Sequence, residues 1–130
     1  VYKMPVLMAF YNHWNVRMEV SEAELLASWK EFFSTGTNWK DLEKEITYEE
    51  YRKISDKNHI QKIMKMPVHF LLKSGEEFFV KKDGAALALR DEMEEIVKEP
   101  VLAEQMKDVI EYRAMDYYRR RYKEKIKALL

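Results

Sequence analysis

The sequence predicts an α+β fold that is predominantly helical, and three observations lead to that expectation. Ser21-x-x-Glu24 is a capping box, and the apolar residues after it recur at three- and four-residue intervals, as they do along an amphipathic helix. Asp83-Gly84 separates two short apolar runs, and this dipeptide favours the tight turn of a β-hairpin. The 130 residues are 47% hydrophobic and contain no cysteine, which is typical of one packed domain without disulfides.

The first half of the chain is expected to hold helices around a single strand. Pro5 is tolerated in a first helical turn, so the apolar opening run should form a buried helix. Val16, Met18 and Val20 alternate with charged residues, which predicts a strand with one apolar face. The expected elements are, in order, a helix from Pro5 to about His13, a strand over residues 16–20, the capping-box helix from Ser21 to Gly36, and a short helix from Thr47 to about Ile54.

The stretch that follows is expected to form two helices separated at a proline. Pro67 disfavours the α conformation at the residue before it, so a helix capped by Asp56 should stop near Lys65. Pro67 also suits a first helical turn and Gly75 suits a helix end, which predicts a second, short helix from Pro67 to Ser74.

A β-hairpin over residues 78–89 is expected next. A two-residue type I′ turn at Asp83-Gly84 would pair Val80 with Leu87, because the turn fixes the register of the strands. One face would then be apolar and fit for burial, and the other would present Lys81 and small alanines to solvent. The buried face would consist of Phe78, Val80, Leu87 and Leu89.

Residues 91–130 are expected to form a helical extension packed on the core. Asp91-x-x-Glu94 has the spacing of a helix cap, and Pro100 should close that helix and open another. Apolar residues then recur at helical intervals, which predicts a long terminal helix to about Lys127.

The predicted order of elements is that of a winged-helix domain. If residues 36–55 are set aside as an insert, the elements run helix, strand, helix, helix, strand, strand, and the strand over 16–20 would close a three-stranded sheet with the hairpin. We therefore expect a single domain with a winged-helix-like core over residues 1–90 and the extension over 91–130. The chain opens with Val1 rather than methionine and already in helix, so we expect a piece of a longer protein.

Several stretches resemble one family of nucleic-acid enzymes. YKMPVLMAFYN and SEAELLASWKEFF, with the later MPVHFL, EEFFVKKDGAALAL and IEYRAMDYYRRRY, are similar to accessory regions that follow the motor core of bacterial superfamily II DEAD/DEAH-type helicases and some restriction proteins. The resemblance covers most of the chain and rests on hydrophobic, structural motifs. It implies a non-catalytic, helicase-associated module whose partners include the rest of the parent chain.

Basic residues are clustered although the chain is formally neutral, with 23 basic and 23 acidic residues. Residues 52–82 hold eight basic against three acidic residues, and residues 113–127 hold seven against two, an excess of five in each. Asn and Gln side chains on one side of a helix can hydrogen-bond to bases, and Lys side chains there can reach phosphates. A helix face that contacts only solvent has the same composition. Arginines interleaved with tyrosines suit contact with phosphates and bases, or packing of the helix on the core. The expected contacts to DNA or RNA are Lys57, Asn58, Gln61, Lys62, Lys65, Lys81, Lys82, Arg119, Arg120 and Arg121.

The sequence predicts no catalytic residue, metal or cofactor. Three glycines cannot supply a phosphate-binding P-loop, and His13, His59 and His69 lie on separate predicted elements without zinc spacing. No apolar run approaches the roughly 18 residues of a membrane span, and no signal peptide is visible. The absence of cysteine is compatible with a reducing compartment, so we expect a cytoplasmic protein without membrane contact.

A protein-interaction or oligomerisation domain without nucleic-acid contact is the alternative. The acidic runs over residues 41–50 and 91–99 would then matter more, and the terminal helix would dock on the parent chain or on a second copy in a homodimer.

Overall fold

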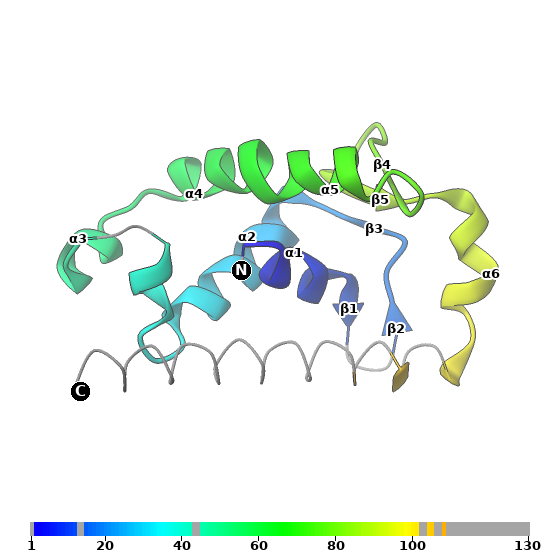
Figure 1. The fold of residues 1–130 in the computed structure, drawn as a ribbon, viewed down its shortest axis with the longest axis horizontal. Coiled ribbons are helices and arrows are strands. Elements are labelled where there is room, and N and C mark those ends of the chain that lie inside the picture. The colour runs from blue at the N-terminus through cyan, green and yellow to red at the C-terminus, as the bar shows by residue number, and fades with distance from the viewer. Residues whose placement is uncertain (1, 13–14, 43–44, 102–103, 106–107, 109–130) are drawn as a thin grey trace.

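The computed structural model describes residues 2–12, 15–42, 45–101, 104–105 and 108 (Figure 1). Helices predominate among them, accompanied by a small three-stranded antiparallel sheet, so the expected helical α+β class is confirmed. The elements are α1 (Lys3–Phe10), β1 (Tyr11–Asn12), β2 (Asn15–Val16), β3 (Glu19–Val20), α2 (Glu22–Ser34), η1 (Asn38–Asp41), α3 (Tyr48–Arg52), α4 (Asp56–Ile63), η2 (Met64–Val68), α5 (His69–Ser74), β4 (Phe79–Val80), β5 (Leu87–Leu89), η3 (Asp91–Met93) and α6 (Glu94–Val97).

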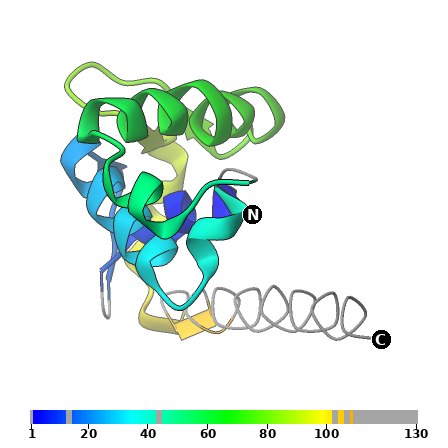
Figure 2. The ribbon, with the colours of Figure 1, turned by 90° about the vertical axis from the view of Figure 1, so that its left-hand side faces the viewer.

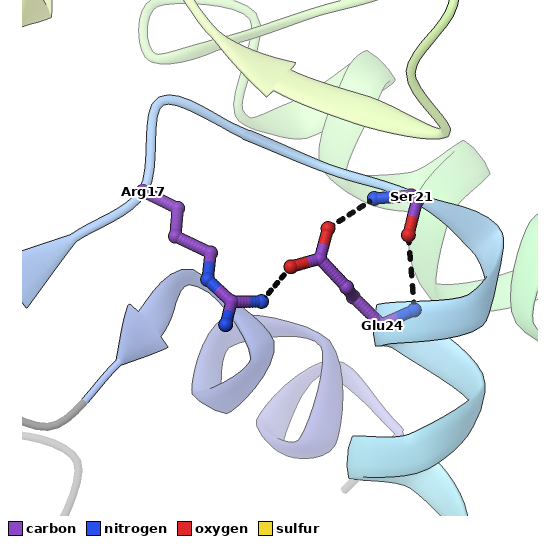
Figure 3. Close-up of polar contacts among 3 residues, drawn as sticks. All are labelled: Arg17, Ser21 and Glu24. Carbon is purple, nitrogen blue, oxygen red and sulfur yellow. Dashed lines mark hydrogen bonds and ion pairs between the residues drawn. The ribbon is translucent and has the colours of Figure 1, made fainter.

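The start of α2 is built as the sequence predicts. The Ser21 hydroxyl accepts a hydrogen bond from the Glu24 backbone N–H at 3.1 Å, and the Ser21 N–H donates to Glu24 Oε1 at 3.0 Å. Arg17 forms an ion pair with the other oxygen of the same carboxylate (Figure 3). The Arg17 N–H donates to the Phe10 carbonyl oxygen at 2.7 Å, so the helix start is also tied to the end of α1.

The core lies between α1, α2 and the sheet. Its largest fully buried side chains include Phe10 from α1 and Trp29 and Phe33 from α2. The centroids of the Trp29 and Phe33 rings lie 4.7 Å apart, so the two rings pack against each other. This packing is expected for the apolar side of α2. Gly36 follows the helix end with a φ of 56°, a conformation that favours glycine.

One continuous helix, residues 56–74, is formed by α4, η2 and α5, and we call it the rod. It lies as an outer layer over α1 and α2 (Figure 1 and Figure 2). The predicted break at Pro67 is therefore wrong. Proline lacks the N–H of a regular helix and crowds the preceding turn, and the rod accommodates it by widening to a π-helical turn over Met64–Val68. Pro67 and Val68 are buried, so packing on the rest of the core holds this turn in place.

The N-cap of the rod is Ser55, which corrects the prediction of Asp56. The Ser55 hydroxyl accepts from the Asn58 backbone N–H at 3.1 Å, and Asp56 is the first helical residue. Asp56 instead pairs with Lys30 of α2 at 2.9 Å.

The predicted strand over residues 16–20 is split between two sheets. Val16 pairs with Tyr11 in the two-stranded sheet β1–β2, which the sequence did not indicate. Glu19 and Val20 pair with Ala88 and Leu87 in the sheet of order β3-β5-β4. The expectation that this part of the chain closes a three-stranded sheet with the hairpin is confirmed for β3.

The hairpin register differs by one residue from the prediction. Val80 pairs with Ala88 rather than Leu87. The Ala85 N–H donates to the Lys82 carbonyl oxygen at 3.2 Å, and within this turn only Gly84 has a positive φ, 82°. A type I′ turn needs two such residues, so this turn is of another type.

The shifted register changes which hairpin side chains are buried. Phe78 is 50% exposed, whereas Ala86 and Ala88 are 8% and 0% exposed. The predictions of a buried Phe78 and of alanines facing solvent are therefore wrong. The reason is that all three residues of β5 are buried, so both of its faces are covered and alternation along it carries no signal.

Gly75, at the junction between the rod and the hairpin, leaves no room for a side chain. An added Cβ would lie 2.8 Å from the Leu71 carbonyl oxygen and 3.1 Å from Phe79 Cδ2. We expect Gly75→Ala to lower the free energy of unfolding by about 1–3 kcal/mol, because the backbone must shift. Urea denaturation measures the loss, with the neighbouring exposed Ser74→Ala as the control. Equal stability of the two variants would contradict this packing.

The region after the hairpin differs in its first turn from the prediction. Asp91–Met93 forms a 3-10 helix before the short α6, which ends at Val97. Asp91 does not cap this helix, since the N-cap is Arg90, and its carboxylate pairs with Lys82. The predicted terminal helix, with the packing of the 91–130 extension, lies mostly outside the described residues.

Candidate nucleic-acid interface

Four of the predicted contact residues share the outer side of the rod, three on α4 and Lys65 on η2. Lys57, Asn58, Gln61 and Lys65 are exposed and lie at helical spacing, and we call this surface the α4 face. The opposite side buries His59 and Ile63. Helical periodicity predicted the exposed Asn58, Gln61 and Lys65, but it did not predict the burial of His59.

An open pocket of about 450 Å³ adjoins the α4 face. The rod contributes two amide side chains and two lysines to its wall, and residues before the rod contribute apolar groups. Amides donate and accept hydrogen bonds, and ammonium groups attract anions. The pocket can therefore hold a ligand that has hydrogen-bonding groups beside a negative charge. The lining residues are Leu42, Ile54, Asn58, His59, Gln61, Lys62 and Lys65.

Lys62 also has an intramolecular role that the sequence did not indicate. Its ammonium donates to the Leu42 carbonyl oxygen at 2.8 Å and lies 5.4 Å from the centroid of the Tyr2 ring. The Tyr2 hydroxyl donates to the same carbonyl oxygen at 2.7 Å. Lys62 therefore fastens the segment before α3 onto the rod, and its replacement would change both packing and charge.

His59 forms the base of the α4 face and is 3% exposed. Its Nδ1 accepts a hydrogen bond from the Trp29 indole N–H at 3.1 Å. Its ring meets the Tyr51 ring edge-on at 6.0 Å. His59 thus positions α4 on α2 and α3. The sequence signal for this role is its spacing of four residues from the buried Ile63.

The hairpin lysines form a second, separate group. Lys81 is exposed and pairs with no acidic residue in the described part of the chain, and Lys82 forms an exposed ion pair with Asp91 at 3.2 Å. The hairpin lies beside α5, at the end of the rod remote from the start of α4 (Figure 1). A 19-residue helix is about 28 Å long, so the structure does not gather the two groups into one compact patch. Arg119, Arg120 and Arg121 lie outside the described residues.

The rod carries a local positive charge in a neutral chain. Residues 56–74 contain four lysines and one acidic residue, Asp56, although the chain has 23 acidic residues in all. Positive charge concentrated on one exposed helix creates a local field for anions, even where the net charge is zero.

The comparisons with known proteins give no neighbour. No protein-family model, curated protein or solved structure matches this chain. Within the described residues, no three His, Cys, Asp or Glu side chains are close enough together to hold a metal ion. The helices described here include none with the length and apolar character needed to cross a membrane.

Proposed function

We propose that this chain is a non-catalytic nucleic-acid-binding module of a larger helicase or restriction-type protein. The observation that carries the proposal is the α4 face, where Lys57 and Lys65 flank Asn58 and Gln61 on a helix whose one acidic residue, Asp56, pairs with Lys30. Lysines that neutralise phosphates release counterions, and this release supplies much of the affinity of such proteins. Asn and Gln next to them can bond the edges of bases.

A winged-helix-like core is part of the same proposal. The order α1, β3, α2, rod, β4, β5 supports it, as does the pairing of β3 with the hairpin strand β5. Two features depart from the usual pattern: η1 and α3 lie between α2 and the rod, and the hairpin lies at the far end of the rod. We therefore assign the main contacts to the α4 face and an additional phosphate contact to Lys81.

The resemblance to helicase-associated regions supports a parent chain as the partner of this module. A cytoplasmic location belongs to the proposal for the same reason, together with the absence of cysteine.

Charge reversal on the α4 face tests the proposal. We expect the 130-residue chain to bind fluorescein-labelled oligonucleotides, with an affinity that falls steeply between about 50 and 200 mM salt. The double variant Lys57→Glu, Lys65→Glu should weaken binding about tenfold or more, measured by fluorescence anisotropy, because two phosphate contacts become repulsive. Lys62 is left intact because it also holds Leu42.

A matched control separates the α4 face from net charge. The variant Lys3→Glu, Lys40→Glu changes the formal charge equally at two exposed lysines outside the rod. An equal loss in this control, or no binding by the unmodified chain at low salt, would reject the α4 face as the interface.

A protein-interaction domain is the second candidate, because Met66 and Phe70 expose apolar surface on the rod at 37% and 48%. Light scattering distinguishes it. A stable homodimer that ignores oligonucleotides would support the interaction domain and contradict nucleic-acid binding.

A further inference from the structure

The exposed side of the rod continues beyond the α4 face to the end of α5. Exposed residues recur every three or four positions along its whole length, and three of them are lysines. We call this surface the rod face. After the acidic Asp56, its exposed residues are Lys57, Asn58, Gln61, Lys65, Met66, His69, Phe70, Lys73 and Ser74.

The wide turn at Met64–Val68 helps to keep the rod face on one side. In an uninterrupted α-helix, Lys57 and Lys73 would lie about 160° apart around the axis, because each residue turns the chain by about 100°. One extra residue accommodated in a π-helical turn reduces that angle to about 60°. The distortion at Pro67 therefore brings the lysines at the two ends of the rod toward the same side.

Phe70 is the aromatic residue of the rod face. It is 48% exposed, its ring meets the His69 ring edge-on at 5.8 Å, and Lys73 lies one helical turn later. Phenylalanine has no hydrogen-bonding group, so its ring cannot recognise the donors and acceptors of base pairs in a groove. It can stack on the flat face of an unpaired base.

We infer that the rod face binds single-stranded nucleic acid, with phosphates on Lys57, Lys65 and Lys73 and a base stacked on Phe70. This inference rests on the proposed function and specifies its ligand. The lysines span about 24 Å along the helix, so a strand lying along the rod can contact all three. Aromatic rings beside a basic track are the usual means of holding single strands without sequence preference.

Replacement of Phe70 tests the stacking contact. The probe is a labelled 12-mer of deoxythymidine, compared with a 12-base-pair duplex of mixed sequence in the same buffer. We expect Phe70→Leu to weaken binding of the single strand about 5- to 150-fold, since stacking on an aromatic ring contributes that much per base. Phe70→Tyr should bind like the unmodified protein, because it keeps the ring, and duplex binding should be insensitive to both changes.

Tyr48→Leu is the matched control, because Tyr48 is an aromatic residue of similar exposure, 49%, on α3 rather than on the rod. Thermal unfolding of each variant checks that the fold is kept. Equal binding of the single strand by Phe70→Leu and the unmodified chain would overturn the inference. So would competition by poly-glutamate as effective as that by a single strand of equal charge, which would indicate an acidic protein partner.

The outcomes also separate this inference from the proposed function. Lysine-dependent binding that is as tight for the duplex as for the single strand, and insensitive to Phe70, would reject only the stacked single strand. Absence of binding to either oligonucleotide would reject both.

Discussion

Replacing Trp29 with alanine is expected to lower the free energy of unfolding by about 3–5 kcal/mol, the usual loss when a buried tryptophan is truncated. Trp29 is 0% exposed and packs against Tyr2 and Phe33. Its indole N–H is also the donor to His59 Nδ1, so truncation removes the contact that fixes α4 on α2. A loss of this size is comparable to the whole stability of many small domains. Urea denaturation followed by circular dichroism measures it.

Two further variants separate the contributions of Trp29. Trp29→Phe keeps a ring but removes the N–H donor. We expect it to lower the free energy of unfolding by less than the alanine variant does. Trp39→Ala makes the same truncation at a half-buried tryptophan that packs on Tyr48 and Tyr51, so its loss should be smaller. Equal losses at Trp29 and Trp39 would contradict the central position of Trp29.

Replacing Ala88 with lysine is expected to lower the free energy of unfolding by an amount on the order of 4 kcal/mol, because it buries an unpaired charge. Ala88 is 0% exposed in the central strand and pairs with Glu19 on one side and Val80 on the other. With the register predicted from a two-residue turn, Ala88 would face solvent and the change would be nearly neutral. Thermal and urea unfolding of this one variant therefore distinguish the two registers.

Ala85→Lys is the control for Ala88→Lys, because Ala85 lies in the half-buried turn of the same hairpin. Stability close to that of the unmodified chain is expected for it. If Ala88→Lys were equally well tolerated, the observed strand pairing would be wrong.

The features that the sequence predicted correctly depend on residues close together in the chain. The capping box at Ser21 needs a partner only three residues away and forms as expected, and the helix expected from Thr47 begins there with the Thr47 side chain as its cap. The α4 face was predictable for the same reason, since helical spacing decides which side chains share a side. The order of residues within these segments is sufficient to specify such local contacts.

The features that were missed depend on distant contacts. Pro67 remains inside a helix because the rod packs on the core there, and β5 does not alternate because both of its faces are buried. Lys62 meets Leu42 across 20 positions and His59 meets Trp29 across 30, which no local pattern reveals. The wall of the pocket beside the α4 face includes Leu42, which precedes α3 in the chain. Helical periodicity within α4 therefore could not predict the pocket.

The Leu42 carbonyl oxygen joins three parts of the chain at a single atom. Tyr2 donates to it from the N-terminus and Lys62 donates to it from the rod, while Leu42 itself follows η1. A ligand that pulls on α4 must therefore carry the first turn of α1 with it or break one of these bonds. Force applied to the rod would in this way reach the N-terminal segment directly, without passing through the sheet.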